Sequence, residues 1–190
     1  HRQFDVVQDF IRFFRSSETL VLLDPVMGDN GKPYALYDAR MQTAMRQLAA
    51  EADVLTPNLT EACILTSTPY RSEGWTEEAL FSLVRQLAAL GAQKVVISGI
   101  PMGEDLGNVL LEQGKEPQIL CSRRVGTERC GTGDIFSSIL AADAVNGVPL
   151  DVSVRKAANF ISECILVTEN FDTPVTDGVC FEELLYKLDR

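Results

Sequence analysis

The sequence has few of the residues that build metal sites. It contains one histidine, His1, and five cysteines without a C-x-x-C pair. A structural zinc site is therefore not expected, and neither is histidine acid–base chemistry. It also lacks any run of about 18 uncharged apolar residues, the length that crosses a bilayer. The first residues do not have the charged-then-apolar order of a signal peptide. We expect a cytoplasmic protein with no membrane partner.

Basic residues are also scarce. Lys and Arg total 17 against 27 for Asp and Glu, which gives a formal net charge of −10. This charge disfavours nonspecific binding to nucleic acid or anionic lipid. No G-x-G-x-x-G follows an early strand, so a Rossmann dehydrogenase is not expected. An anionic ligand would have to be bound by helix N-termini, backbone amides and bound cations.

The 190 residues, 46% of them hydrophobic, are enough for one globular core. No Pro-, Gly- or Ser-rich linker divides them, so residues 1–190 are expected to form a single domain. Helical and strand-like patterns alternate, which predicts an α/β fold with a mainly parallel sheet. The expected helices are 4–17, 38–51, 76–90, 132–145 and 150–169, with an amphipathic stretch at 181–188. The expected strands are 20–26, 52–55, 94–98, and an antiparallel edge pair at 107–113 and 118–123.

Polar residues follow three of the predicted strands. The first strand leads into Asp24–Asp29 (DPVMGD), the second into Thr56–Glu61 (TPNLTE), and the third into Ser98 and Gly99. In open α/β sheets ligands bind at the carboxyl ends of the strands. The sequence therefore predicts a binding site at this edge of the sheet.

A glycine-rich segment, Gly131–Asp134 (GTGD), precedes an apolar helical pattern. Glycines at a helix start let phosphate oxygens approach the backbone amides closely. Asp134, in the first turn, could accept a proton from a substrate hydroxyl. A plain helix N-terminus with a favourable acidic residue is the alternative interpretation.

Two carboxylates, Glu61 and Asp29, lie beside loops where a divalent cation could screen phosphate charge. Magnesium takes one or two protein carboxylates. The alternative is local: Asn58 or Thr60 could cap a helix that begins near Leu59, with Glu61 favoured in its first turn. Both interpretations stay open at the level of the sequence.

Taken together, these segments resemble the ribokinase-like superfamily and, within it, the pyridoxal kinases. The matching segments occur in the family's order and spacing: Asp24–Asp29, Gly31–Tyr34 (GKPY), Thr56–Glu61, Val95–Gly99 (VVISG) and Gly131–Asp134. The resemblance implies a three-layer α/β/α kinase that phosphorylates the 5′-hydroxymethyl group of pyridoxal, pyridoxine or pyridoxamine with ATP, Mg²⁺ and K⁺.

The resemblance also implies the role of each residue. Asp134 matches the family's catalytic base, and Gly131, Thr132 and Gly133 match its anion hole. Cation-binding positions are matched by Asp24, Tyr34, Thr56 and Glu61. The positions beside the nucleotide and its phosphates are matched by Asp24, Asp29, Asn58, Ser98, Gly131 and Gly133.

The same resemblance leaves alternatives. Many hydroxymethylpyrimidine kinases have Cys where this chain has Asp134, which favours vitamin B6. A kinase for hydroxymethylpyrimidine or another small alcohol, or a non-catalytic protein that binds nucleotide or vitamin, remains possible. A full-length family member is expected to have a further N-terminal portion, which the chain lacks, and to form a homodimer.

Overall fold

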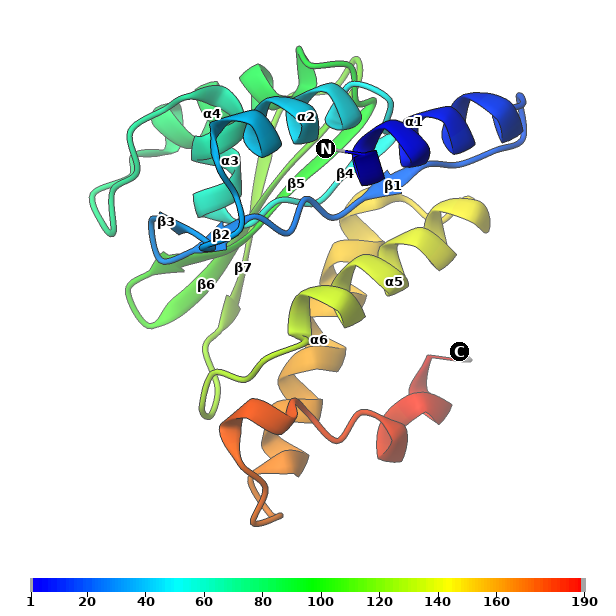
Figure 1. Ribbon diagram of the computed structural model, residues 1–190. Coiled ribbons are helices and arrows are strands. Elements are labelled where there is room, and N and C mark those ends of the chain that lie inside the picture. Colours follow the sequence, from blue (N-terminus) through cyan, green and yellow to red (C-terminus); the bar gives the residue numbers. More distant parts are fainter. Residues whose placement is uncertain (1, 189–190) are drawn as a thin grey trace. The chain divides into compact units, whose positions relative to one another are not determined.

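The computed structural model describes residues 2–188, and its fold is drawn in Figure 1. The chain divides into two compact units, each described by itself. Unit 1 comprises residues 1–101 and 107–119, and unit 2 comprises residues 102–106 and 120–190. The helices are α1 (Arg2–Phe14), α2 (Ala39–Ala49), α3 (Leu59–Thr66), α4 (Glu77–Ala88), α5 (Thr132–Val145) and α6 (Leu150–Thr168), followed by the 3₁₀ helices η1 (Val175–Asp177) and η2 (Glu182–Lys187).

The main sheet has five strands in the order β1-β4-β5-β6-β7. These are β1 (Leu22–Leu23), β4 (Val54–Leu55), β5 (Lys94–Met102), β6 (Asp105–Glu112) and β7 (Gln118–Arg123). The first three run parallel. The connections from β5 to β6 and from β6 to β7 are too short for parallel crossovers, so these neighbours are antiparallel. The predicted α/β fold with a mainly parallel sheet and an antiparallel edge pair is confirmed.

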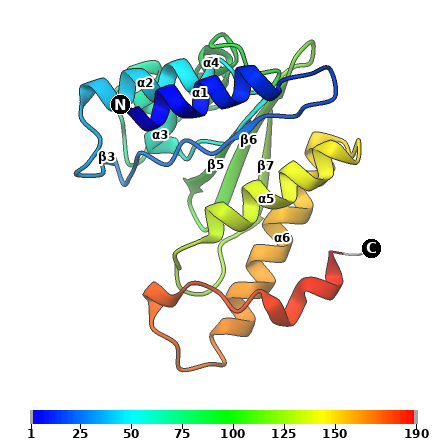
Figure 2. The same cartoon turned by 45° about the vertical axis from the view of Figure 1, so that its right-hand side comes forward.

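Helices α1 to α4 lie together on one side of the strands of unit 1, as Figures 1 and 2 both show. Helix α4 is capped by Thr76, whose side chain accepts a hydrogen bond from the amide of Ala79. Its buried face consists of Leu80, Leu83, Val84 and Leu87. These leucines have the helical spacing that the sequence shows, and the buried strand residues of β4 and β5 complete the core.

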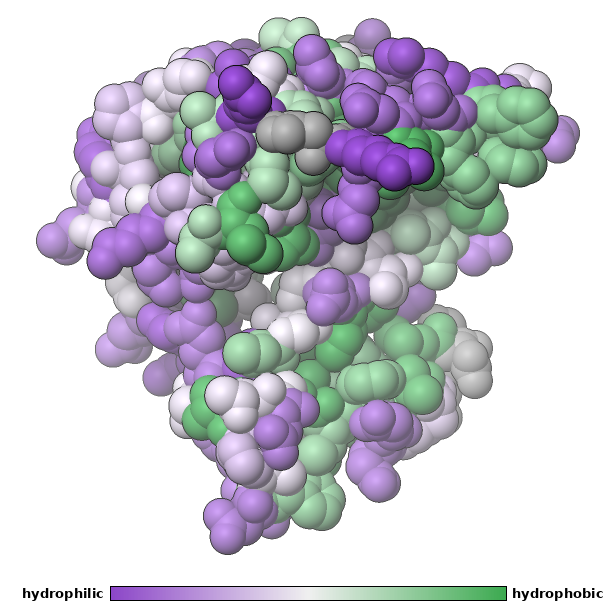
Figure 3. All heavy atoms as spheres, viewed as in Figure 1, coloured by the Kyte–Doolittle hydropathy of each residue, from purple (hydrophilic) through white to green (hydrophobic). Residues whose placement is uncertain are grey.

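Helix α1 differs from the other α-helices of residues 2–188 because none of its residues is buried. Ion pairs join it to the rest of unit 1: Arg12 contacts Glu51 at 2.9 Å and Arg15 contacts Asp53 at 2.6 Å. Its apolar side chains are exposed, with Phe13 at 81%. They form the green area at the right of Figure 3.

Several predicted boundaries were wrong. The first helix was expected at 4–17 and spans Arg2–Phe14, and the first strand was expected at 20–26 but pairs only at Leu22–Leu23. The amphipathic stretch at 181–188 is a 3₁₀ helix at Glu182–Lys187. The antiparallel pair β2 (Gly28–Asp29) and β3 (Lys32–Pro33) was not predicted. Helices α5 and α6 lie within a residue of their predicted ends.

In unit 2, α5 and α6 pack against each other. Asp143 of α5 is buried, and its carboxylate accepts a hydrogen bond of 2.8 Å from Lys156 of α6. This partner offsets part of the cost of burying the charge. No helix within residues 2–188 has the length and apolarity needed to span a membrane.

Candidate active site

Unit 1 brings one group of predicted site residues to the carboxyl ends of the parallel strands. Asp24 directly follows β1, Thr56 directly follows β4, and Ser98 lies in β5. Because β1, β4 and β5 are adjacent and parallel, these positions share one edge of the sheet. The predicted strand-end position is confirmed for Asp24 and Thr56, whereas Ser98 lies inside β5, which continues to Met102. That this edge binds a ligand stays a prediction.

The N-terminus of α3 is closed by its own side chains. Asn58 Oδ1 accepts a hydrogen bond from the amide of Glu61 at 2.9 Å, and Glu61 Oε2 accepts one from the amide of Asn58 at 2.8 Å. This reciprocal pair is a capping box. The local interpretation of Glu61 is therefore confirmed, with Asn58 and not Thr60 as the capping residue.

The second oxygen of Glu61 joins α3 to the loop after β1. Glu61 Oε1 accepts a hydrogen bond of 3.0 Å from the amide of Met27. Glu61 is only 3% exposed. The pKa of Glu61 is raised to about 7, mainly because burial disfavours the charged form. The negative charge of Asp24 contributes to this rise, and hydrogen bonds from backbone amides oppose it.

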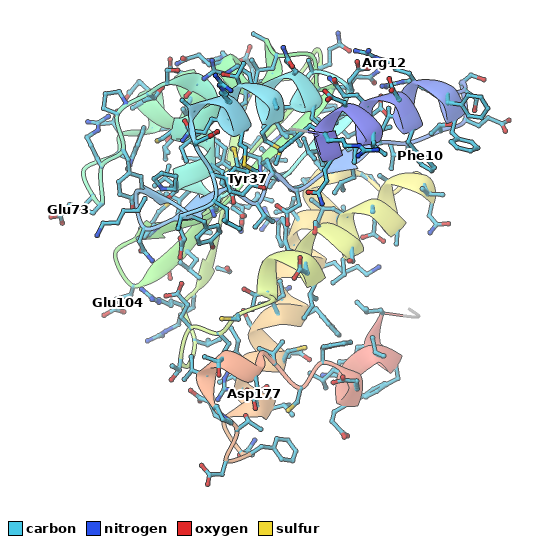
Figure 4. All side chains as sticks on the ribbon, in the orientation of Figure 1. Phe10, Arg12, Tyr37, Glu73, Glu104 and Asp177 are labelled. Atoms are coloured by element: carbon cyan, nitrogen blue, oxygen red, sulfur yellow. The ribbon has the colours of Figure 1, made fainter. Side chains whose placement is uncertain are left out.

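A tyrosine that the sequence did not single out also belongs to this group. Burial raises the pKa of Tyr37, and the charge of Glu61 adds to the rise. Figure 4 labels its side chain in unit 1. The buried Glu61 carboxylate is therefore close enough to Asp24 and to the Tyr37 phenol for their charges to influence one another. A bound cation would favour its ionised form.

The β2–β3 hairpin carries Asp29 and is attached to the start of α3. Asn58 Nδ2 donates to the carbonyl of Gly28 at 2.9 Å. The amide of Gly31 donates to Thr60 Oγ1 at 2.9 Å. Asp29 is exposed, and its carboxylate accepts hydrogen bonds from Asn30. The turn has positive φ at Asn30 (50°) and Gly31 (75°), so the Asn-Gly pair was the sequence signal for this hairpin.

The other predicted site residues of unit 1 form hydrogen bonds with backbone atoms. The Thr56 hydroxyl, in a residue 3% exposed, donates to the carbonyl of Leu23 at 3.4 Å. The amide of Ser98 donates to the carbonyl of Pro57 at 3.0 Å, which ties β5 to the loop before α3. Tyr34 is half-exposed, and its amide donates to the carbonyl of Met27 at 2.8 Å.

Unit 2 holds the glycine loop, Gly131–Gly133, and Asp134. Gly131 is the N-cap of α5 with φ 78°, and no side chain caps this helix start. A Cβ added at Gly131 would meet nothing within 4 Å. Asp134 is exposed in the first turn of α5. This helix start therefore presents amide donors and a carboxylate to solvent, as anion binding and proton transfer require.

Three arginines precede the glycine loop and have different environments. Arg123 and Arg124 are exposed and lie within 3.9 Å of Glu104 and 3.4 Å of Glu128. Arg129 is buried, and its guanidinium contacts oxygen atoms of residues 173–178. Arg123 and Arg124 are therefore surface residues, and Arg129 is not.

The carboxylates of unit 1 are too few for a closed metal cage. Within residues 2–188, no group of three or more His, Cys, Asp or Glu side chains is placed to hold a metal ion. Asp24 and Glu61 make a pair, and the number of carboxylates that magnesium takes from a protein is one or two.

Known kinases are similar to this chain over most of its length. Residues 2–176 match the phosphomethylpyrimidine kinase family. The chain is 32% identical over 147 residues to the pyridoxine kinase of Bacillus subtilis, covering 76% of this chain and 53% of the relative. It is 31% identical over 153 residues to a hydroxymethylpyrimidine/phosphomethylpyrimidine kinase of Haemophilus influenzae, covering 76% and 54%. The chain thus spans about half the length of the curated relatives it matches.

Solved structures share the fold. A Bacteroides thetaiotaomicron protein crystallised with pyridoxal superposes with a TM-score of 0.93 at 33% identity, covering 100% of this chain and 67% of that chain. The ADP complex of Bacillus subtilis pyridoxal kinase gives a TM-score of 0.70 at 28% identity, covering 85% and 60%. The predicted resemblance to the pyridoxal kinases is confirmed. With the match over residues 2–176, these similarities show that the chain belongs to the phosphomethylpyrimidine kinase family.

Proposed function

We propose that the protein transfers the γ-phosphoryl group of ATP to the 5′-hydroxymethyl group of pyridoxal, pyridoxine or pyridoxamine. The observation that carries this proposal is Asp134, an exposed carboxylate in the first turn of a helix that begins with a glycine loop. Family membership supports it, as do relatives whose structures contain pyridoxal or ADP.

Asp134 is the proposed base. Its carboxylate accepts the proton of the substrate hydroxyl as the oxygen forms a bond to the γ-phosphorus. The bond between that phosphorus and the bridging oxygen breaks, and ADP leaves with the electron pair. Exposure of Asp134 suits this role, because the carboxylate must be ionised and must reach a ligand.

The glycine loop is the proposed anion hole. The first amides of α5 have no partner within the helix, and no side chain of the helix start caps them. These amides and the positive end of the helix dipole would stabilise the charge on the transferring phosphoryl group. The open space beside Gly131 supports close approach of phosphate oxygens.

We propose that the unit 1 carboxylates hold the cations that accompany ATP. Asp24 and Glu61 would be the charged groups, with Thr56 and Tyr34 near them, and Asp29, Asn58 and Ser98 beside the nucleotide. The raised pKa of Glu61 supports this, since nearby positive charge would restore its ionised form. Magnesium would neutralise charge on the phosphates, and K⁺ is the proposed monovalent ion. A Glu61→Gln variant with an unchanged magnesium requirement would contradict the assignment.

Hydroxymethylpyrimidine is the second candidate acceptor. It is favoured by the family match and by a relative that is 31% identical and named as a kinase for that substrate and its phosphate. Asp134, at the position where many such kinases have cysteine, favours vitamin B6. Both reactions use the same chemistry, so acceptor selectivity separates them.

The test is an ATP-consumption assay with pyridoxal, pyridoxine, pyridoxamine and hydroxymethylpyrimidine offered separately with Mg²⁺ and K⁺. Turnover with the B6 vitamers supports the proposal, and turnover with the pyrimidine alone assigns the second function. Binding of ATP without turnover on any acceptor indicates the non-catalytic alternative. Formation of a homodimer stays a prediction, to be measured on the same preparation by sedimentation.

A further inference from the structure

Arg129 is a buried cation two residues before the glycine loop. It is 9% exposed. No carboxylate within the described residues 2–188 lies at ion-pair distance from it: the salt bridges of this region involve other arginines. A buried charge needs compensating polar contacts, so the partners of this guanidinium show what it does.

Those partners all come from residues 173–178. Arg129 Nη1 lies 3.2 Å from Thr173 Oγ1, 3.4 Å from the Thr173 carbonyl oxygen, and 3.3 Å from each of the carbonyl oxygens of Pro174 and Gly178. One nitrogen with two hydrogens cannot make four full hydrogen bonds. The contacts are therefore shared and mainly electrostatic, with carbonyl dipoles directed at the charge. Arg129 Nε is buried without a hydrogen-bond partner.

This segment lies beside the chain that enters the glycine loop. Figures 1 and 2 show residues 173–178 (orange) next to the loop that precedes α5, and Figure 4 labels Asp177 in the segment. A Cβ added at Gly178 would lie 3.4 Å from the carbonyl oxygen of Cys130. The backbone at Cys130, the residue before Gly131, therefore packs directly against the segment.

Arg129 is also joined to the start of α5. The hydroxyl of Thr132 donates to the carbonyl oxygen of Arg129 at 3.4 Å. Upstream, Glu169 Oε1 accepts a hydrogen bond of 3.1 Å from the amide of Thr127, and Gly126 packs tightly against Glu169. The chain on both sides of Arg129 is thus held, while the glycine loop itself is exposed.

From these contacts we infer that Arg129 is a positioning residue, which fixes the glycine loop by holding residues 173–178 against it. Its side chain binds the segment, and its carbonyl oxygen binds the residue that follows Gly131. Loss of the guanidinium would free residues 173–178, and the backbone that carries this carbonyl oxygen would no longer be held against them. The inference rests on the proposed function in one respect: the loop it fixes is the one proposed to receive phosphate.

The test compares Arg129→Met, which keeps the length but removes charge and donors, with Arg129→Lys, which keeps a charged nitrogen. Arg155→Met is the control, because Arg155 is an exposed arginine of α6 in the same unit. Amide hydrogen exchange is measured on the intact protein. We expect faster exchange in both 135–138, the first amides of α5 that are hydrogen-bonded to carbonyl oxygens of residues 131–134, and 173–178 for Arg129→Met, partial recovery for Arg129→Lys, and no change for the control.

Faster exchange in 173–178 alone would overturn the inference, because it would show a local structural role. If Arg129→Met does not fold, Thr173→Val takes its place, since it removes the 3.2 Å acceptor and leaves Arg129 intact. Faster exchange at the start of α5 and in 173–178 then supports the inference, and faster exchange in 173–178 alone overturns it.

A kinetic comparison adds a second readout. In Arg129→Met the displaced loop should lose a hydrogen bond from an amide to a charged phosphate oxygen. The KM for ATP should therefore rise at least about tenfold, with a smaller effect on kcat. An unchanged KM alongside faster exchange at 135–138 would overturn the claim that the loop receives phosphate. Absence of turnover in the unaltered protein would refute the proposed function, and the exchange comparison would still decide whether Arg129 positions the loop.

Discussion

The N-termini of α3 and α5 carry similar residues in opposite arrangements. At α3, Asn58 and Glu61 cap each other, and Glu61 is 3% exposed with both carboxylate oxygens bonded to backbone amides. At α5, Gly131 offers no side chain, and Asp134 is exposed. Each helix has an acidic residue in its first turn, yet only that of α5 is directed to solvent.

The difference shows how burial separates two roles for one residue type. The α3 carboxylate accepts hydrogen bonds from amides at the helix start and in the loop after β1. These contacts stabilise the folded protein. The α5 amides remain without a side-chain cap, so a ligand can take them. A change at α3 should therefore act mainly on stability, and a change at α5 mainly on chemistry.

The largest expected effect is that of Asp134→Asn. The change removes the base and keeps nearly the same shape. Loss of general-base catalysis should lower kcat by roughly 10²- to 10⁴-fold, with ADP affinity largely retained. Steady-state kinetics and calorimetric ADP titration check the two halves of this prediction. Full activity of the variant would remove the contrast between the two helix starts.

The next effect concerns the pH dependence of stability at α3, measured without divalent cations. The Glu61 pKa is raised from an ordinary 4.5 to about 7. Between those values the unfolded chain loses the proton and the folded protein keeps it. The free energy of unfolding should therefore fall as pH rises through this window, by on the order of 2–3 kcal/mol.

Glu61→Gln should remove most of that pH dependence, since glutamine does not titrate. Glu73→Gln is the control, because Glu73 is exposed in the loop labelled in Figure 4. Urea denaturation at several pH values gives the comparison. Equal slopes for Glu61→Gln and the unaltered protein would show that the buried carboxylate is not the cause.

Alanine substitutions at two glycines of unit 2 distinguish backbone strain from loss of ligand binding. Gly131 has φ 78° and Gly147 has φ 73°, and a Cβ would meet nothing within 4 Å at either position. Alanine at each should therefore cost about 1–2 kcal/mol of stability through the left-handed backbone alone. Only Gly131→Ala should weaken the binding of a non-hydrolysable ATP analogue in a titration. Equal affinities for the analogue would exclude the loop as the site of the γ-phosphate.

The smallest effects are expected from two N-cap variants, Asn58→Ala and Thr76→Ala. Loss of an N-cap costs about 1 kcal/mol. Here the side chain also donates to the carbonyl of Gly28, so Asn58→Ala should destabilise more than Thr76→Ala, which removes only the cap of α4. Thermal unfolding of the two variants measures the difference, and a larger loss for Thr76→Ala would contradict it.

The sequence predicted the long helices best. Helix α5 has the predicted ends because an apolar pattern follows the glycines directly, and α6 has a continuous helical period. Short strands were poorly predicted, since β1 and β4 pair over two residues each and their neighbours supply the pairing. The β2–β3 hairpin was missed because strands of two residues carry no period, although Asn30–Gly31 was a turn signal.

Site residues were found from their places after strands and before α5, but their contacts could not be predicted. The capping interpretation of Glu61 was open in the sequence, whereas its bond to the Met27 amide depends on how the loop after β1 folds back. The sequence shows of Arg129 only that it lies two residues before Gly131. Its burial depends on residues 173–178, which are more than 40 positions away along the chain.

The most direct test of the proposed function follows a labelled γ-phosphoryl group from ATP to pyridoxal, with the unaltered protein and Asp134→Asn side by side. The account predicts labelled pyridoxal 5′-phosphate from the unaltered protein and, from the variant, very little product despite retained ADP binding. Equal amounts of labelled product from both proteins would contradict the role of Asp134, and no labelled product from the unaltered protein would contradict the proposed reaction.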